Sequence, residues 1–335
     1  MECAHNHPYT EISHRFTTDG AFAGIDSACS LRYVASMAEP VPGILSSSQL
    51  PRLTWSNVSR LIRLSNQTGT WLLLLPTLWA LVFAARGIPP WHLIVIFSLG
   101  AFLMRSAGVV LNDWADRSYD RHVARTQRRP LASGELTARH ALIILVILLT
   151  LAALLVFLLN VRTLLLSPIA LLLAALYPFA KRILHVPQAM LGIAFGWGTI
   201  MAWTASRDTV EAPAWFIFGA TICWAIGYDT IYALQDQEDD RRIGVKSSAL
   251  FFGRSTWLAV GIALAVMLML LGMAGWITQI GWIFYGVLVA TGLYCAKQVV
   301  ELRNPVQSAR AFHMFHEHVW LGSAILVGSI AGFLR

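Results

Sequence analysis

The chain has 335 residues, of which 56% are hydrophobic and only 13% are charged, whereas roughly a quarter of the residues in an average soluble domain are charged. The long uncharged runs exclude an ordinary soluble globular protein and predict an all-α polytopic membrane protein. The net charge of +7 does not require a nucleic-acid partner, because basic residues gather in the loops on one side of a membrane protein. The four cysteines show no metal-binding spacing.

The N-terminal part of the chain differs from the rest. Residues 1–54 are rich in Ser, Ala, Pro and Gly and contain no sustained apolar run. A segment of this composition cannot bury enough apolar surface to fold, so we expect a disordered tail followed by a transmembrane domain over residues 55–335. The tail contains more acidic residues than arginines, which does not fit a mitochondrial transit peptide. The first part of the domain, residues 55–70, is amphipathic and predicts an interfacial lead-in to the first span.

Nine apolar spans follow, and each is about the length that crosses a bilayer once. The third and fourth spans are separated only by residues 160–162, and we divide them because their combined run is about twice the length of one span. The predicted spans are Trp71–Ala85, Trp91–Leu111, Ala141–Asn160, Thr163–Ala180, Pro187–Ala205, Ala214–Leu234, Thr256–Ile277, Gly281–Ala296 and Val319–Leu334.

The second span leads into a stretch rich in aspartate and arginine. If its helix continues, Asn112, Asp116 and Asp120 lie at i, i+4 and i+8 and therefore share one face. Asp113 adds another carboxylate, and oxygen side chains crowded in this way suit Mg²⁺. Arginines that follow could bind phosphate oxygens by bidentate hydrogen bonds: Arg121, Arg125, Arg128 and Arg129. Carboxylates and arginines at a membrane surface together indicate a diphosphate substrate with an apolar tail.

The sixth span leads into a stretch of the same kind. Asp229, Tyr232, Asp236 and Asp240 are spaced to share one helical face, and Asp239 lies close to that face. Basic residues follow again: Arg241, Arg242 and Lys246. A solvated charged face would explain either stretch alone, but two such stretches at equivalent positions favour one shared site.

Three further basic residues have two interpretations each. Arg105 lies within the second span, seven residues before Asn112, and either forms a salt bridge in the bundle or serves a polar cavity. Lys181 and Arg182 end the fourth span and act either as basic anchors at the interface or as ligands for an anion.

The distribution of basic residues predicts the orientation of the domain. With nine spans, both Asp-rich stretches lie on the same side as the N-terminus and the loops after the fourth and eighth spans. This side carries 20 of the 25 Lys and Arg residues, the other side carries 4, and Arg105 lies within a span. The positive-inside rule places the richer side in the cytoplasm or its organellar equivalent.

The motifs in these stretches are similar to those of the UbiA-type intramembrane prenyltransferases. The first stretch matches the family's NDxxDxxxD motif and its RTxxRPL extension, and the second matches DxxYAxxDxxDD followed by GxKS. MRSAG, YPFAKR and GIAFGWG are further matches, and the resemblance covers about residues 55–334. The details most resemble the 4-hydroxybenzoate polyprenyltransferase branch. That branch usually has R-x-D-K-P-I-G-T before the first span, where this chain has RLSNQTGT from Arg63 to Thr70.

The resemblance implies nine transmembrane helices around a central cavity capped by two Asp-rich cytoplasmic loops. It implies bound Mg²⁺, for which we name as candidate ligands Asn112, Asp113, Asp116, Asp120, Asp236, Asp239 and Asp240. The candidate ligands of a diphosphate are Arg125, Arg128, Arg129, Lys181 and Lys246. Asp116, Asp229 and Asp236 are the candidate catalytic residues, and Arg182 and Tyr232 are the candidates for binding the acceptor.

The implied reaction is the transfer of a polyprenyl group from a polyprenyl diphosphate to an aromatic acceptor, with 4-hydroxybenzoate in ubiquinone biosynthesis as the first expectation. Mg²⁺ assists ionisation of the diphosphate, and the aromatic ring then attacks the allylic cation. Another aromatic or quinone-precursor acceptor is the alternative within the family. A transporter is the alternative of a different class, although the acidic clusters lie at one surface rather than at the midplane. We expect the bacterial inner membrane, with the mitochondrial inner membrane as the alternative.

Overall fold

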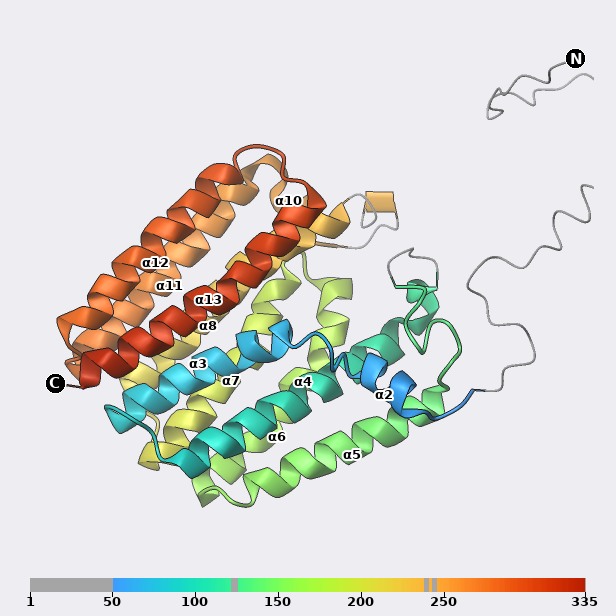
Figure 1. Ribbon diagram of the computed structural model, residues 1–335, viewed down its shortest axis with the longest axis horizontal. Helices are drawn as coiled ribbons and strands as arrows, with labels where there is room; N and C mark the ends of the chain where they lie inside the picture. Colours follow the sequence, from blue (N-terminus) through green and yellow to red (C-terminus); the bar gives the residue numbers. More distant parts are fainter. Residues whose placement is uncertain (1–50, 122–125, 238–240, 243–245, 335) are drawn as a thin grey trace, which may run out of the picture. The chain divides into compact units, whose positions relative to one another are not determined.

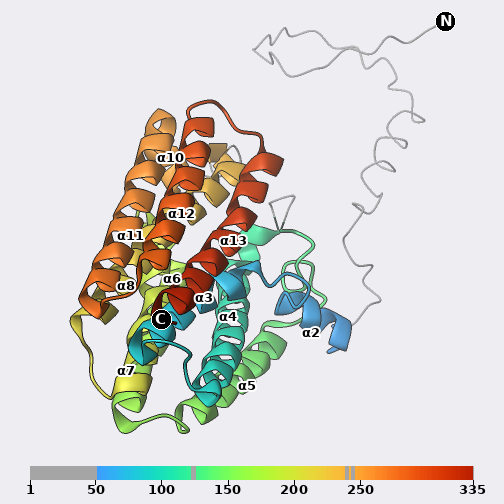
Figure 2. The same ribbon diagram turned by 60° about the vertical axis from the view of Figure 1, so that its left-hand side comes forward.

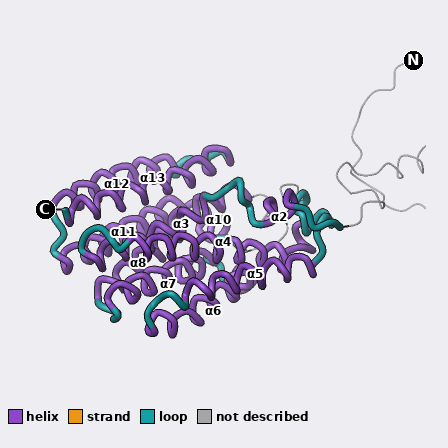
Figure 3. Tube along the Cα trace, turned by 60° about the horizontal axis from the view of Figure 1, so that its bottom comes forward, coloured by secondary structure: helices purple, strands orange, loops and turns teal. Residues whose placement is uncertain are grey.

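The computed structural model describes residues 51–121, 126–237, 241–242 and 246–334, with residues 180–182 described by their backbone alone. The predicted disordered tail therefore falls almost entirely outside the described residues. Within these ranges the chain forms helices and no strand (Figure 3). This confirms the prediction of an all-helical protein.

The described residues include nine helices of 18 residues or more. Seven of them are long and apolar enough to cross a membrane, and α7 and α13 are outside that set. The chain is therefore a multi-pass membrane protein. The nine helices are α3 (Thr68–Ala85), α4 (Trp91–Asp120), α5 (Ala138–Val156), α6 (Val161–Ile183), α7 (Pro187–Arg207), α8 (Ala212–Ala233), α11 (Thr256–Thr278), α12 (Trp282–Glu301) and α13 (Ser308–Phe333).

The helices pack side by side as a bundle (Figures 1 and 2). Helix α3 packs against α4, α7 and α13, while α8 packs against α7, α11 and α13. Helix α5 lies at the edge of the bundle, next to α4 (Figure 1). The largest fully buried side chains are aromatic, among them Trp79, Trp203 and Trp224, and they join α3, α7 and α8 into one core.

Helix α4 is longer than a membrane span needs to be. Its 30 residues make a helix of about 45 Å, whereas the hydrocarbon core of a bilayer is about 30 Å thick. The helix therefore continues past the apolar segment to Asp120. This confirms the predicted continuation and places Asn112, Asp116 and Asp120 on one helical face.

The predicted division of the third and fourth spans is also confirmed. Helix α5 ends at Val156, and α6 begins at Val161. Asn160 fixes the turn, because its side-chain oxygen accepts hydrogen bonds from the backbone N–H and the hydroxyl of Thr163, at 2.9 and 2.7 Å. Its amide nitrogen donates to the carbonyl oxygen of Thr204 at 2.8 Å, which ties the turn to the end of α7.

Two helix ends differ from the prediction. Helix α13 begins at Ser308, well before Val319, because its polar first half is stabilised by the pairing of Arg310 with Glu301 at the end of α12. Helix α8 ends at Ala233 and is followed by a 3₁₀ turn over Leu234–Asp236. The prediction of an uninterrupted α-helix through Asp236 is therefore wrong by one turn, which reflects the common tightening of helix ends.

Candidate active site

A cavity of about 1010 Å³ lies among α3, α4, α6, α7 and α8. Along α4 it extends from Ile96 to Asp120. The part beside Ile96, Phe97 and Gly100 is apolar, and the part beside Asn112 and Asp120 is polar. The cavity can therefore hold a molecule with a polar head and a long apolar tail.

The cavity brings the two Asp-rich stretches together. Asn112, Asp116 and Asp120 line it from α4, and Asp229 and Asp236 line it from α8 and the following turn. Their segments are more than a hundred residues apart in the sequence. Residues of both motifs therefore line one space, whereas Asp239 and Asp240 lie outside the described residues.

Tyr232 also lines the cavity and forms part of an aromatic wall. Its ring packs against Phe315 of α13, with the ring centroids 4.7 Å apart, and lies 6.4 Å from the ring of Phe312. A flat aromatic molecule could stack against such a wall. Binding of the acceptor by Tyr232 stays a prediction.

The predicted diphosphate-binding residues are in different positions. Arg129 lines the cavity, and so does Lys246, whose Nζ donates a hydrogen bond to the carbonyl oxygen of Ile183 at 3.0 Å. Arg128 has an exposed side chain that is not among the lining residues, and its carbonyl oxygen accepts a hydrogen bond from Arg60 at 2.9 Å. The side chains of Arg125, Lys181 and Arg182 are outside the described part of the chain.

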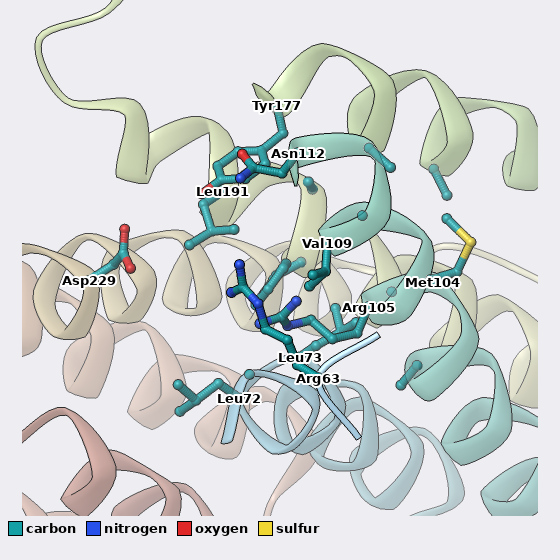
Figure 4. A pocket seen from close by; sticks show the side chains of 18 of the residues that line it. Arg63, Leu72, Leu73, Met104, Arg105, Val109, Asn112, Tyr177, Leu191 and Asp229 are labelled. Atoms are coloured by element: carbon teal, nitrogen blue, oxygen red, sulfur yellow. The ribbon is translucent and has the colours of Figure 1, made fainter. Parts of the chain in front are cut away.

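Two arginines reach the middle of the cavity. Arg105 extends from α4, and Arg63 extends from the segment before α3, so that their guanidinium groups lie next to each other (Figure 4). Asp229 lies across from them, and Tyr177 of α6 lies beside Asn112 (Figure 4). Arg105 therefore lies where one of its two predicted roles, in the polar cavity, would place it.

Arg63 and Tyr177 are residues of the site that the sequence alone did not single out. Arg63 was assigned only to the amphipathic lead-in, although its match to the family's arginine before the first span was a usable signal. Tyr177 belongs to the YPFAKR motif, of which only the two basic residues are candidates in the sequence. Gln188, near the start of α7, also lines the cavity, and no sequence pattern marks it.

Asp113 does not line the cavity. Its side chain is 2% exposed, and its Oδ1 accepts hydrogen bonds from Arg63 Nη2 and Arg129 Nη1, each at 3.0 Å. Arg129 Nη1 also donates to Asp120 Oδ2 at 2.8 Å. Arg63 reaches this position with a left-handed backbone, φ 54°, directly after helix α2 (Trp55–Leu61). Leu61 anchors α2 in a small apolar cluster with Val110 of α4.

The oxygen atoms at the polar end of the cavity fit Mg²⁺. Among the described residues, no three His, Cys, Asp or Glu side chains are gathered closely enough to hold a metal ion by themselves. However, Mg²⁺ in proteins commonly takes only one or two carboxylates and completes its octahedron with substrate phosphates and water. Asn112, Asp116, Asp120 and Asp236 offer such ligands around one space.

The family model of the UbiA prenyltransferase family matches residues 73–319. The chain is 44% identical over 276 residues to the 4-hydroxybenzoate octaprenyltransferase of Cronobacter sakazakii, covering 82% of this chain and 95% of that protein. It is also 44% identical over 271 residues to the 4-hydroxybenzoate octaprenyltransferase of Coxiella burnetii, covering 80% of this chain and 93% of the relative.

Solved structures have the same fold. The apo structure of a UbiA homolog from Aeropyrum pernix K1 is similar with a TM-score of 0.68 at 24% identity, over 79% of this chain and 98% of that chain. A UbiA homolog from Archaeoglobus fulgidus bound to GPP and Mg²⁺ is similar with a TM-score of 0.57 at 18% identity, over 81% of this chain and 99% of that chain. The match to the family model and the two relatives lead to one conclusion: the chain belongs to the UbiA prenyltransferase family.

Proposed function

We propose that the protein transfers a polyprenyl group from a polyprenyl diphosphate to 4-hydroxybenzoate, a step of ubiquinone biosynthesis. One observation carries the proposal: the oxygen side chains of two distant Asp-rich stretches and the guanidinium groups of Arg63 and Arg105 line one cavity with a long apolar extension. The names of relatives with 44% identity support the acceptor and the prenyl donor.

The diphosphate lies at the polar end of the cavity. Asn112, Asp116, Asp120 and Asp236 would hold Mg²⁺ there, and Asp239 and Asp240 are further candidates. When bound, Mg²⁺ would supply positive charge that neutralises the diphosphate and lowers the barrier to its departure. Arg129 and Lys246 line the same end and contribute positive charge toward the departing group. Arg125, Arg128 and Lys181 remain candidates for the same role.

The prenyl chain lies along the apolar part of the cavity, beside Ile96 and Phe97 of α4. The apolar walls exclude water from the allylic cation that forms when the diphosphate leaves, so the cation reacts with the acceptor rather than with water. A chain too long for the cavity can continue into the bilayer.

The acceptor lies between the two arginines and Asp229. Its carboxylate binds the guanidinium of Arg105 or Arg63, which suit a planar carboxylate, and its phenol faces Asp229. The negative charge of Asp229 raises the electron density of the ring, and this carboxylate is the candidate that takes the proton. Tyr232 is the candidate for stacking on the ring. Arg182, predicted from the sequence, is the competing ligand for the carboxylate.

The site faces the cytoplasm, because the basic loops lie on its side of the predicted topology. The proposal of nine membrane spans is supported by the length of α7 and α13, which could each cross a bilayer in addition to the seven apolar helices of the described residues.

A comparison of acceptors tests the proposal. Purified protein is given Mg²⁺, a polyprenyl diphosphate, and either 4-hydroxybenzoate or its methyl ester. We expect the ester to have a KM on the order of tenfold higher or more, because it cannot form the charged pair with an arginine. In Arg105→Gln this preference disappears, and in Arg182→Gln it persists. If the unmodified protein used both acceptors equally well, the proposal of 4-hydroxybenzoate would be wrong, and another acceptor of the family would take its place.

A further inference from the structure

Asp113 stands apart from the other acidic residues of the first Asp-rich stretch. It follows Asn112 directly, so on α4 it is rotated by about 100° away from the face that Asn112, Asp116 and Asp120 share. Its side chain is 2% exposed, and it is not among the residues that line the cavity. The first stretch therefore contains acidic residues in two different environments.

The partners of Asp113 are both cations of the site. Its Oδ1 accepts hydrogen bonds from Nη2 of Arg63 and from Nη1 of Arg129, each at 3.0 Å, and both arginines line the cavity. We propose that Asp113 is a positioning residue that holds Arg63 and Arg129 at the cavity, rather than a ligand of the metal. This inference rests on the proposed function, because it assigns the two arginines to the anionic groups of the substrates.

The positive charges around Asp113 explain why a carboxylate is needed at this position. The guanidinium groups of Arg63 and Arg105 lie side by side (Figure 4), and two like charges at such a partly buried place repel each other. The carboxylate of Asp113 offsets this repulsion. Gly69 of α3 also leaves room for Arg105, because an added Cβ there would lie 2.8 Å from Nη2 of that arginine.

The same carboxylate connects three parts of the chain. Arg63 precedes α3, Asp113 belongs to α4, and Arg129 follows α4. Arg129 then continues the chain of contacts to Asp120, whose Oδ2 accepts its hydrogen bond at 2.8 Å. Loss of the charge at Asp113 therefore frees the cations on both sides of it, while Asp116 keeps its place at the cavity.

The test compares Asp113→Asn with Asp116→Asn, two isosteric changes one helical turn apart. Mn²⁺ replaces Mg²⁺, and its binding in the presence of geranyl diphosphate is measured by electron paramagnetic resonance. At saturating geranyl diphosphate, we expect the Mn²⁺ affinity of Asp113→Asn to fall far less than that of Asp116→Asn, because the carboxylate of Asp113 does not line the cavity. In Asp113→Asn we expect the KM values for both substrates to rise on the order of tenfold, because this is the size of effect expected for the loss of one charged hydrogen bond.

A double variant tests whether Asp113 acts through Arg63. Because the two residues share one contact, Asp113→Asn combined with Arg63→Gln raises the KM for 4-hydroxybenzoate no further than Arg63→Gln alone. If Asp113→Asn fails to fold, Arg63→Gln must still raise that KM without loss of Mn²⁺ binding.

Two results would overturn the inference: a loss of Mn²⁺ affinity in Asp113→Asn equal to that in Asp116→Asn, or effects of the two single changes that multiply in the double variant. The Mn²⁺ measurement needs no aromatic acceptor. If the unmodified protein does not prenylate 4-hydroxybenzoate, the proposed function fails, and the Mn²⁺ comparison still decides whether Asp113 is a metal ligand.

Discussion

Gly69 and Arg105 meet where α3 passes α4 beside the cavity. A Cβ added at Gly69 would lie 2.4 Å from Nε and 2.8 Å from Nη2 of Arg105, closer than van der Waals contact allows. Arg105 can occupy its place only because residue 69 has no side chain. The family's RxDKPIGT segment has a glycine at this position too, even though its acid, base and proline are replaced in this chain.

We predict that Gly69→Ala displaces the guanidinium of Arg105 and raises the KM for 4-hydroxybenzoate. We expect an increase on the order of 10- to 100-fold, because a displacement of about 1 Å in an active site has an effect of this size. The KM for the prenyl diphosphate should change little. Steady-state kinetics with each substrate varied in turn measures both values.

The control for this change is Gly272→Ala in α11, where an added Cβ would meet nothing within 4 Å. It should leave both KM values as they are. Equal increases of the two KM values in Gly69→Ala would mean that the change distorts the whole site, and would remove the specific role of Arg105.

At the scale of single residues, the sequence predicted which side chains share a helical face better than it predicted which side chains form ion pairs. Asn112, Asp116 and Asp120 could be placed on one face because helical periodicity is local. The contact of Asp113 with Arg63 joins residues 50 positions apart and depends on how the segment before α3 packs against α4. No periodicity carries that information, so the sequence grouped Asp113 with the metal ligands.

The junction of α12 and α13 shows how polar residues stabilise an element. Arg310 donates to both carboxylate oxygens of Glu301, at 2.7 and 2.8 Å, and to Glu317 at 2.8 Å. Gln298 also donates to Glu317 at 2.7 Å. The charged residues before Val319 are thus paired within α13 and with α12, which is why sequence hydropathy placed the start of the last helix too late.

Arg310→Ala should therefore loosen the start of α13. We expect a loss of roughly 1 kcal/mol in stability, because the partners are partly exposed and solvent screens part of the attraction. The melting temperature in detergent measures the change, and the exposed Arg254→Ala is the control. An unchanged melting temperature of Arg310→Ala would show that the network contributes nothing to stability.

The same network predicts a pH dependence. Burial alone would raise the pKa of Glu317, but the hydrogen bonds from Arg310 and Gln298 outweigh it and hold that pKa below its ordinary value. A lowered pKa stabilises the folded state above the unfolded pKa, about 4.3 for Glu, and this contribution is lost as the pH falls through the folded pKa. The difference between Arg310→Ala and the unmodified protein should accordingly shrink below about pH 4.

At the scale of the helical domain, the sequence predicted the arrangement of the two motifs from topology alone. An even number of spans between them requires a common side, and the cavity lined by both Asp116 and Asp236 agrees with this. The number of spans was harder to predict because α7 and α13 are long but contain polar residues. In α7 several of these are buried in the protein interior, and in α13 they lie in the first half of the helix.

Labelling of single cysteines tests this topology. In a variant that lacks the four native cysteines, cysteine is introduced at Gln127, at Arg254 or at Thr209. We predict that the first two react with a membrane-impermeant reagent from the cytoplasmic side and the third from the opposite side, because an odd number of spans separates Thr209 from the other two. Labelling of Gln127 and Arg254 from opposite sides would contradict a shared site.

Product analysis tests the central claim most directly. Purified protein is incubated with Mg²⁺, a polyprenyl diphosphate and 4-hydroxybenzoate, and the product is identified by mass spectrometry. We predict 4-hydroxybenzoate prenylated on a ring carbon, with no product after chelation of the metal or in Asp116→Ala and Asp236→Ala that remain folded in the membrane. Undiminished product formation without divalent metal or in both variants, or no prenylated product at all from the unmodified protein, would contradict it.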